Sequence, residues 1–307
     1  QLAVKQKELT LRVEIKNMTY GATAEPVVVS DDFAYDEDVS DITAGTVTIY
    51  NGAQQAVSGV LPAGTYTAAA SGYKSANYSV RYAAATEFTV NKALLSVTVK
   101  AEPSYAYAEE IAPALGYSGF VNGDTAESVF GDTPYEFVYI KAGEPTKGIL
   151  PVGSYTVSVD GLEADNYSVQ LTEGSFSVER REITLAASAT LSGAWSKSDF
   201  APTNLPGGFA FAGTLSLTEG AKDEPYTLKG VLDDVAPFVW SEPYKITLDG
   251  ADVTQNFAIN YNVSVKIDNT DFSIAPIEPF SADYTGKAIA LGHGITVNDA
   301  PEDLKIE

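Results

Sequence analysis

The chain contains an internal repeat of turn and strand residues. The segment GTYTAAASGYKSANYSV (64–80) is followed later by GSYTVSVDGLEADNYSV (153–169). The two copies share Gly-x-Tyr-Thr, a second glycine and Asn-Tyr-Ser-Val at the same internal spacing, and a Leu-Pro pair precedes each of them. A self-similar sequence builds the same supersecondary structure each time it occurs. We therefore predict an array of similar units instead of one large domain.

Further matches set the boundaries of the units. The alternating patterns LTLRVEI and LLSVTVKA open the first two copies, and REITLAASA opens a third, decayed copy that keeps Asn256-Phe257 where the others have Asn-Tyr. We predict four segments: repeat 1 (1–92), repeat 2 (93–181), a divergent repeat 3 (182–276) and the incomplete start of a further repeat (277–307).

The pattern within each copy is that of short strands with polar turns between them. Apolar residues alternate with polar ones, and no segment has the 3.6-residue period of an amphipathic helix. In repeat 2 we expect six strands, at 94–101, 116–120, 135–141, 154–159, 166–171 and 174–179. This predicts an all-β fold of tandem immunoglobulin-like β-sandwich modules with antiparallel strands. Because the links between copies are very short, we expect the modules to be arranged end to end.

Two local interpretations concern tyrosines. The repeated motif is interpreted as a hairpin in which Tyr66 and Tyr78 pack across the strand pair, with Tyr155 and Tyr167 as their counterparts. Upstream of it, MTYGATAEPVV matches PSYAYAEEIAPAL, which aligns the tyrosine of the first segment with Tyr105.

These motifs resemble the MBG family, whose mostly-β, glycine-containing repeats occur in large bacterial cell-surface and adhesin-like proteins. The resemblance rests on Thr19-Tyr20-Gly21, Asn122-Gly123-Asp124, Pro151-x-Gly153-x-Tyr155, Gly161 and Asn166-Tyr167. Repeat 2 is the best match, repeat 1 lacks Asn-Gly-Asp, and repeat 3 departs most. The resemblance implies tandem immunoglobulin-like modules on a surface protein, and it carries over no catalytic residues.

Composition excludes several classes of function. With 41 acidic and 19 basic residues the formal net charge is −22, which repels nucleic acid and anionic membranes. The chain has no cysteine, so it has neither disulfides nor a thiol nucleophile. The sequence contains no run of 18 apolar residues, so no membrane insertion is expected in this segment. The only histidine, His293, is expected to be an exposed turn residue.

Two groups of residues are weak candidates for binding. The acidic stretch SDDFAYDEDVSD offers oxygen ligands for Ca²⁺, although its spacing is not that of an EF-hand, and a solvated acidic loop is the alternative. Its candidate ligands are Asp31, Asp32, Asp36, Asp38 and Asp41. Phe211 and Trp240 could stack on a sugar ring, but aromatic residues on strands usually belong to the core. No cofactor other than this possible Ca²⁺ is expected.

Together these observations predict a non-enzymatic repeat region of a bacterial secreted or cell-surface protein, acting as an adhesin stalk or an adhesion module. The alternative is a glycan-binding accessory module of a larger secreted protein. Host or cell-surface glycans or proteins are the expected partners, and the chain is expected to be a monomer. We expect an extracellular or cell-surface location, with the signal peptide and the anchor outside this chain.

Overall fold

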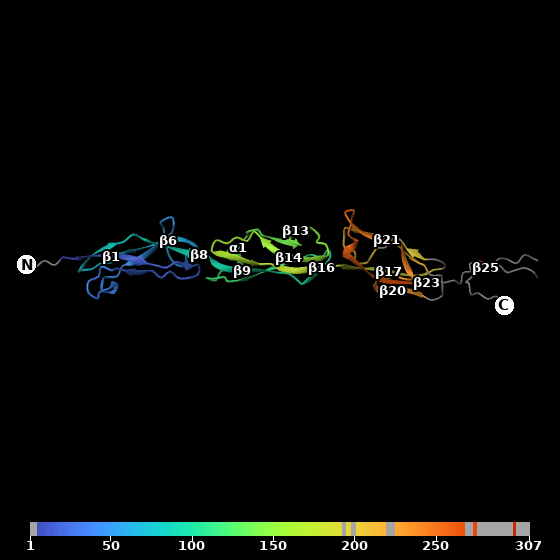
Figure 1. The fold of residues 1–307 in the computed structure, drawn as a ribbon, viewed down its shortest axis with the longest axis horizontal. Helices are drawn as coiled ribbons and strands as arrows, with labels where there is room; N and C mark the ends of the chain where they lie inside the picture. Colours follow the sequence, from blue (N-terminus) through green and yellow to red (C-terminus); the bar gives the residue numbers. More distant parts are fainter. Residues whose placement is uncertain are drawn as a thin grey trace, which may run out of the picture. The chain divides into compact units, whose positions relative to one another are not determined.

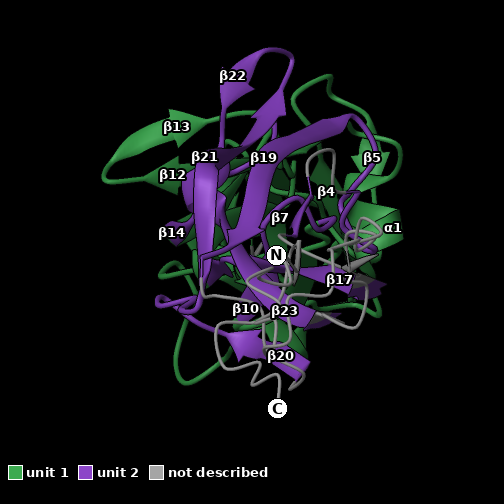
Figure 2. Cartoon of the chain, turned by 90° about the vertical axis from the view of Figure 1, so that its right-hand side faces the viewer, with its two compact units in different colours: residues 1–103, 111–147, 154–176 green, residues 104–110, 148–153, 177–307 purple. Residues whose placement is uncertain are grey.

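The computed structural model describes residues 5–191, 195–197, 201–218, 225–267, 273–274 and 297–298. Nearly all of the regular structure is strand (Figure 1), so the predicted all-β class is confirmed. The chain divides into two compact units, which Figure 2 shows in green and purple. Unit 1 comprises residues 1–103, 111–147 and 154–176. Unit 2 comprises residues 104–110, 148–153 and 177–307.

Repeat 1 is a sandwich of two sheets. One sheet has the order β3-β1-β7, from strands Val27–Val29, Lys7–Glu14 and Tyr78–Tyr82. The other has the order β2-β8-β6-β4-β5, from strands Met18–Thr19, Thr86–Asn91, Gly64–Ser71, Thr46–Tyr50 and Ala56–Val57. Alternation along β1 buries Leu9, Leu11 and Val13 in the core between the sheets.

Repeat 2 has the same strand order. Its smaller sheet is β11-β9-β15, from strands Ala114–Ser118, Ala93–Lys100 and Tyr167–Thr172. Its larger sheet is β10-β16-β14-β12-β13, from strands Ser104–Ala106, Gly174–Glu179, Gly153–Asp160, Glu136–Lys141 and Glu144–Thr146. All six predicted strands are present. The sequence prediction missed β10, β13 and the one-turn helix α1 (Ala126–Phe130), because each is too short to show a period.

The prediction of purely antiparallel strands was wrong. β7 pairs with β1 in parallel, from Lys7↔Tyr78 to Leu11↔Tyr82. After β1 the chain crosses to the other sheet and forms β2, and after β7 it crosses in the same way and forms β8. β2 and β8 also pair in parallel. β15 pairs with β9 in the same way. The first and last segments of each of these repeats therefore run side by side in the same direction.

The hairpin interpretation of the repeated motif was also wrong. β6 and β7 belong to different sheets, and Tyr66 stacks on Phe88 of its own sheet with ring centroids 5.7 Å apart. Tyr78 packs edge-on against Phe33, at 5.6 Å. Buried residues alternate with more exposed ones along β6 and β7. Because the two strands lie in opposite sheets of a sandwich, their buried residues enter the same core from opposite sides. The motif is an arch between sheets.

Repeat 3 keeps only part of this plan. Its first and last strands, β17 (Arg181–Leu191) and β23 (Phe257–Ile267), again pair in parallel, over their whole length. However, β20 (Pro225–Val231) pairs with β23, whereas the corresponding sheet of repeat 2 has β11 beside the first strand. The second sheet has the order β18-β19-β21-β22, from strands Ser196–Lys197, Phe209–Leu217, Phe238–Leu248 and Ala251–Asp252. The divergence therefore extends to topology.

Two short 3₁₀ helices, η1 (Val39–Asp41) and η2 (Thr254–Asn256), precede β4 and β23. Near the C-terminus β24 (Ser273–Ile274) pairs with β25 (Val297–Asn298). Apart from residues 297–298, the predicted start of a further repeat lies outside the described residues. The boundaries between repeats 1, 2 and 3 stay predictions.

Candidate functional site

A cluster of two tyrosines and an aspartate lies where repeat 1 meets repeat 2, within unit 1. The hydroxyl of Tyr20 donates to Asp124 Oδ2 at 3.0 Å, and the hydroxyl of Tyr167 donates to the same oxygen at 2.6 Å. The two buried rings pack edge to face, with centroids 5.4 Å apart. We call Tyr20, Asp124 and Tyr167 the tyrosine junction.

The turn that carries Asp124 is shaped by its sequence. Asn122 and Gly123 have φ values of 57° and 78°, a region that asparagine and glycine tolerate best. The turn is closed by Asp124 N donating to Val121 O at 2.9 Å. Val121 N in turn donates to the Tyr167 hydroxyl at 3.1 Å. The Asn-Gly-Asp motif therefore delivers one carboxylate to the tyrosines of both repeats.

A second contact joins two other repeated motifs. Asn166 of repeat 2 accepts, through Oδ1, the N–H of Ala63 in the Leu-Pro-Ala-Gly loop of repeat 1, at 2.9 Å. Its backbone oxygen accepts the N–H of Ala93, the first residue of β9, also at 2.9 Å. Tyr66 holds the loop by donating to Pro62 O at 2.9 Å. The Leu-Pro-x-Gly loop of one repeat thus meets the Asn-Tyr pair of the next.

Unit 2 contains the equivalent contact between the next pair of motifs. Asn256, which is 3% exposed, accepts the N–H of Val152 through Oδ1 at 3.0 Å. Beside it Tyr107 packs edge to face on Phe257, at 5.3 Å. Phe257 has no hydroxyl, so the hydrogen-bonded triad is replaced here by aromatic packing, to which Phe209 also contributes.

This geometry corrects the alignment of Tyr20 with Tyr105. The N–H of Tyr20 bonds to the oxygen of Asn91, the last residue of β8, and the N–H of Tyr107 bonds to the oxygen of Glu179, the last residue of β16. Tyr107 is therefore the counterpart of Tyr20, two residues beyond the predicted one. Sequence matching missed it because tyrosines occur at both 105 and 107.

The surroundings of Tyr167 change its acidity. Burial of the ring, and after it the hydrogen bond to Asp124, together raise the pKa of its hydroxyl to about 12. An unfolded tyrosine ionises near pH 10. The folded pKa lies above the unfolded one, so this group's stabilisation is complete below pH 10 and is lost as pH rises toward 12.

We expect the free energy of unfolding of unit 1 to fall between about pH 10 and 12, by up to about 3 kcal/mol from Tyr167, since one pKa unit corresponds to about 1.4 kcal/mol. Urea unfolding followed by circular dichroism across this range measures the loss. Tyr167→Phe is the control, because every other tyrosine is retained. Parallel declines in the wild type and the variant would contradict the assignment.

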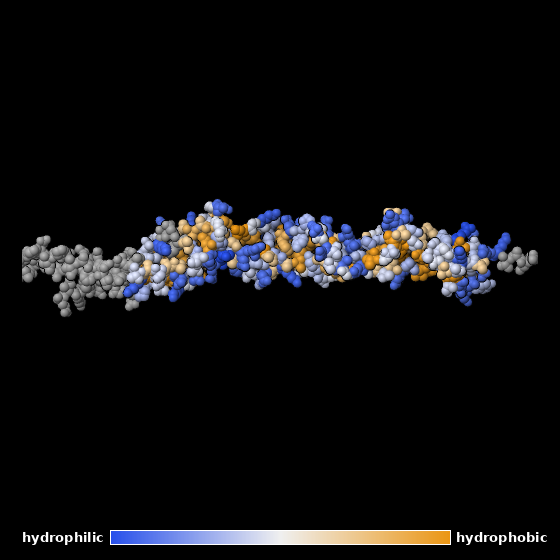
Figure 3. Space-filling view, turned by 180° about the vertical axis from the view of Figure 1, so that it is seen from behind, coloured by the Kyte–Doolittle hydropathy of each residue, from blue (hydrophilic) through white to orange (hydrophobic). Residues whose placement is uncertain are grey.

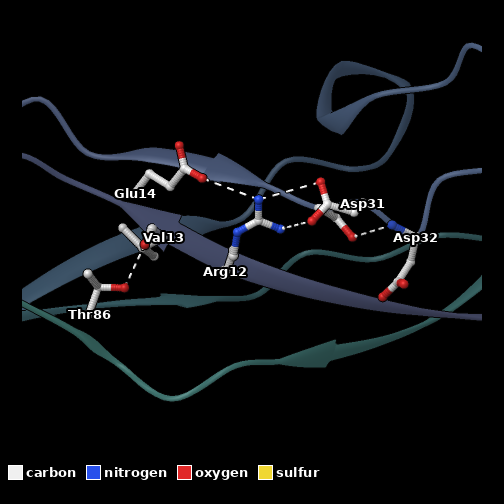
Figure 4. A network of polar contacts seen from close by, with 7 residues as sticks. Arg12, Val13, Glu14, Asp31, Asp32 and Thr86 are labelled. Carbon is white, nitrogen blue, oxygen red and sulfur yellow. Dashed lines mark hydrogen bonds and ion pairs between the residues drawn. The ribbon is translucent and has the colours of Figure 1, made fainter.

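The structure does not bring the five Ca²⁺ candidates together. Asp31 pairs with Arg12 at 2.7 Å, and Figure 4 shows this guanidinium between Asp31 and Glu14. Asp32 accepts the N–H of Thr10 at 2.9 Å, and Asp36 is exposed. Asp31 and Asp32 therefore bind groups of β1.

The other two acidic candidates are helix caps. Asp38 and Asp41 form a capping box around η1, and Ser40 donates to Asp38 through its hydroxyl and its N–H. These bonds lower the pKa of Asp38. In the part of the chain that the structure describes, no group of three or more His, Cys, Asp or Glu residues could hold a metal ion.

Phe211 and Trp240, the candidates for sugar stacking, lie together in repeat 3 and are half-buried. Phe211 stacks on Tyr244 at 6.0 Å, and Trp240 contacts the same ring at 5.0 Å. The indole N–H of Trp240 donates to the hydroxyl of the buried residue Tyr261 at 3.2 Å, which directs the indole toward the opposite sheet. His293 lies outside the described residues.

The surface around the first junction has an open groove. A pocket of about 690 Å³ is lined by the turn after Tyr20, by β4 and β5, and by Asn122. Several of its walls are apolar, including Val47, Ile49 and Val57. In Figure 3 hydrophobic and hydrophilic residues are interspersed on the face shown.

Comparison with known proteins supports the family resemblance for one segment. Residues 97–177 match the family model of the MBG domain (YGX type). The resemblance stated for repeat 2 is thus confirmed. No curated protein matches the sequence.

Solved structures that the chain resembles include the I-band fragment I67–I69 from titin, at 10% identity, covering 85% of this chain and 97% of that one, with a TM-score of 0.22. The three N-terminal domains of the bacteriophage RB49 highly immunogenic outer capsid protein (Hoc) match at 11% identity, covering 85% and 99%, with a TM-score of 0.23. Among the described residues, no helix has the length and apolar character needed to cross a membrane.

Proposed function

We propose that this chain is a non-enzymatic spacer region of a secreted or cell-surface protein, a stalk whose modules are fixed to one another and resist stretching. The MBG match supports membership of a class of repeat modules found in surface proteins. The repeated contacts between Leu-Pro-x-Gly loops and Asn-Tyr or Asn-Phe pairs support modules that are docked as well as linked.

The observation that carries the proposal is the parallel pairing of first and last segments. In repeat 1 the chain enters along β1 and leaves along β8, and β1 lies beside β7 in parallel register. Tension on the chain ends acts on β1 and β8, and it reaches β7 through the link 83–85 once β8 is displaced. The paired strands β1 and β7 are then pulled along their length in opposite directions. All the hydrogen bonds of the ladder then resist together, whereas strands pulled apart from one end break their bonds one at a time.

We expect the resistance of repeat 1 to depend on the direction of pulling. Tension applied to the chain ends in single-molecule force spectroscopy should give a high unfolding force. In the variant with Gln6→Cys and Asn77→Cys, handles sit at the same end of the β1–β7 ladder, and the same repeat should open at a lower force. Forced unfolding reports the unfolding rate, so pulling speed is kept equal.

The natural chain has no cysteine, so the attachment points are unambiguous. Circular dichroism of the double variant checks that it folds. Equal unfolding forces in the two geometries would remove the mechanical argument for a stalk. Specific binding on a glycan array that Trp240→Ala abolishes without loss of stability would favour the glycan-binding module instead.

A further inference from the structure

The loop Phe33–Glu37 of repeat 1 surrounds Tyr78 with a set of polar and aromatic contacts. Ala34 N donates to the Tyr78 hydroxyl at 2.9 Å, and that hydroxyl donates to Glu37. The ring of Phe33 packs edge-on against the ring of Tyr78, at 5.6 Å. We call this loop together with Asn77 and Tyr78 the repeat 1 socket.

Every one of these contacts has a counterpart in repeat 2. Val121 N donates to the Tyr167 hydroxyl at 3.1 Å, and that hydroxyl donates to Asp124 at 2.6 Å. Phe120 packs edge-on against Tyr167 at 5.8 Å. The two loops align without a gap, Phe-Ala-Tyr-Asp-Glu with Phe-Val-Asn-Gly-Asp, so repeat 1 has this element despite lacking the Asn-Gly-Asp motif.

The backbone agrees as well. Tyr35 takes a φ of 58° where Asn122 takes 57°. A bulky residue in this conformation is strained, and it persists where a function or the surroundings maintain it. The residues after each loop also match, because Asp38 and Thr125 both cap the short helix that follows.

The two sockets differ in what covers them. In repeat 2 the carboxylate receives the hydroxyl of Tyr20 and Asn166 receives the N–H of Ala63, both from the preceding repeat. In repeat 1 an open pocket of about 420 Å³ is lined by five of the socket residues together with residues 5–7 and Ala76; the five are Ala34, Tyr35, Glu37, Asn77 and Tyr78. Tyr35 is 99% exposed, and Asn77 is exposed, with no side-chain hydrogen bond to any described residue.

We propose that the repeat 1 socket is a docking site for the trailing end of another repeat of the same kind, placed before Lys7 in the same polypeptide. A tyrosine from a Tyr-Gly turn donates to Glu37, and the N–H of a Leu-Pro-x-Gly loop donates to the side-chain oxygen of Asn77. The proposal goes beyond the stalk function and stands on the junction geometry alone, so the pulling experiment does not decide it.

A covalently joined repeat is favoured over a second copy of the chain. Repeat 1 contributes only a few residues to the junction, whereas stable complexes between separate proteins use about 20–30 residues on each side. These residues include Tyr20, Gly21, Ala63 and Lys92. A one-residue link such as Lys92 raises the effective concentration enough to make so small a contact persist.

The test extends the chain by one repeat. Residues 5–92 are placed directly before residues 7–307, so that Lys92 leads into Lys7 as it leads into Ala93 in the natural chain. Hydrogen exchange of the Ala63 amide in the added copy is followed by NMR with labelled alanine. We expect Asn77→Ala to speed this exchange about fivefold, as Asn166→Ala should for the natural Ala63, because each removes one acceptor.

Ser79→Ala, on the same exposed edge, is the matched control and should leave the exchange rate of Ala63 in the added copy unchanged.

A second variant keeps the test independent of whether the extended chain folds. In the natural chain, Val121→Ala, Asn122→Tyr, Gly123→Asp and Asp124→Glu together install the repeat 1 loop in repeat 2.

Slow exchange of Ala63 retained in that variant supports the proposal, and exchange as fast as in Asn166→Ala overturns it. The extended chain gives a second contradicting outcome. The proposal is overturned if Asn77→Ala leaves the exchange rate of Ala63 in the added copy unchanged while Asn166→Ala speeds the exchange of the natural Ala63.

Discussion

Replacing Tyr167 by alanine is expected to lower the free energy of unfolding of unit 1 by about 3–5 kcal/mol, the usual cost of deleting a large buried aromatic side chain. The ring is 2% exposed and packs edge to face with Tyr20 and Phe120. Its hydroxyl also joins Asp124 to Val121 N, so the substitution removes the acceptor of Val121 N and leaves Asp124 with Tyr20 as its remaining tyrosine donor.

The two tryptophans provide an internal reference for this measurement. Trp195 and Trp240 both lie in repeat 3, within unit 2. In urea titrations, tryptophan fluorescence should therefore follow unit 2 and stay unchanged, while the circular dichroism transition of unit 1 moves to lower urea. Tyr135→Ala is the matched control, since that ring is 47% exposed and should cost little. A loss below about 1 kcal/mol for Tyr167→Ala would show that the junction contributes little to stability.

The fold class and most strands could be predicted because period-two alternation reports which face of a strand is buried. The six strands of repeat 2 were found this way. The same signal does not say which sheet a strand joins, because β6 and β7 alternate alike whether they form a hairpin or an arch. Parallel pairing of β1 with β7 is a contact between residues far apart in sequence, and a local pattern carries no information on it.

The candidate site was only partly accessible from the sequence. The repeated motifs Leu-Pro-x-Gly and Asn-Tyr were identified, but they were assigned to one hairpin within a repeat. The structure shows that Ala63 and Asn166 meet between repeats, and a single sequence cannot distinguish these cases. The Ca²⁺ candidates were chosen by acidic density alone. Two of them, Asp38 and Asp41, cap a helix, as Thr125 and Ser128 do in repeat 2 without a charge.

Gly21 gives a second test of the junction, independent of the tyrosine hydroxyls. It follows Tyr20 with a φ of 96°, and a Cβ there would lie 2.8 Å from Val121 Cγ2. Gly21→Val should therefore cost about 2–4 kcal/mol, from a left-handed backbone that β-branched residues avoid and from overpacking against the next repeat. Urea unfolding of unit 1, read by circular dichroism, measures the loss.

The counterpart of Gly21 in repeat 2 is Ala108, which adopts a φ of 60° despite its Cβ. Ala108→Gly should relieve backbone strain and stabilise the chain by up to about 1 kcal/mol, with the sign opposite to that of Gly21→Val. Val121→Gly combined with Gly21→Val, compared with Val121→Gly alone, separates the two causes, because it removes Val121 Cβ as well as both methyl groups and leaves the backbone strain. If the second substitution restores none of the lost stability, the cost arises within repeat 1, and Gly21 is then a turn residue with no part in docking repeat 2. If it restores about half or more, Gly21 is a glycine because the next repeat approaches too closely for any side chain.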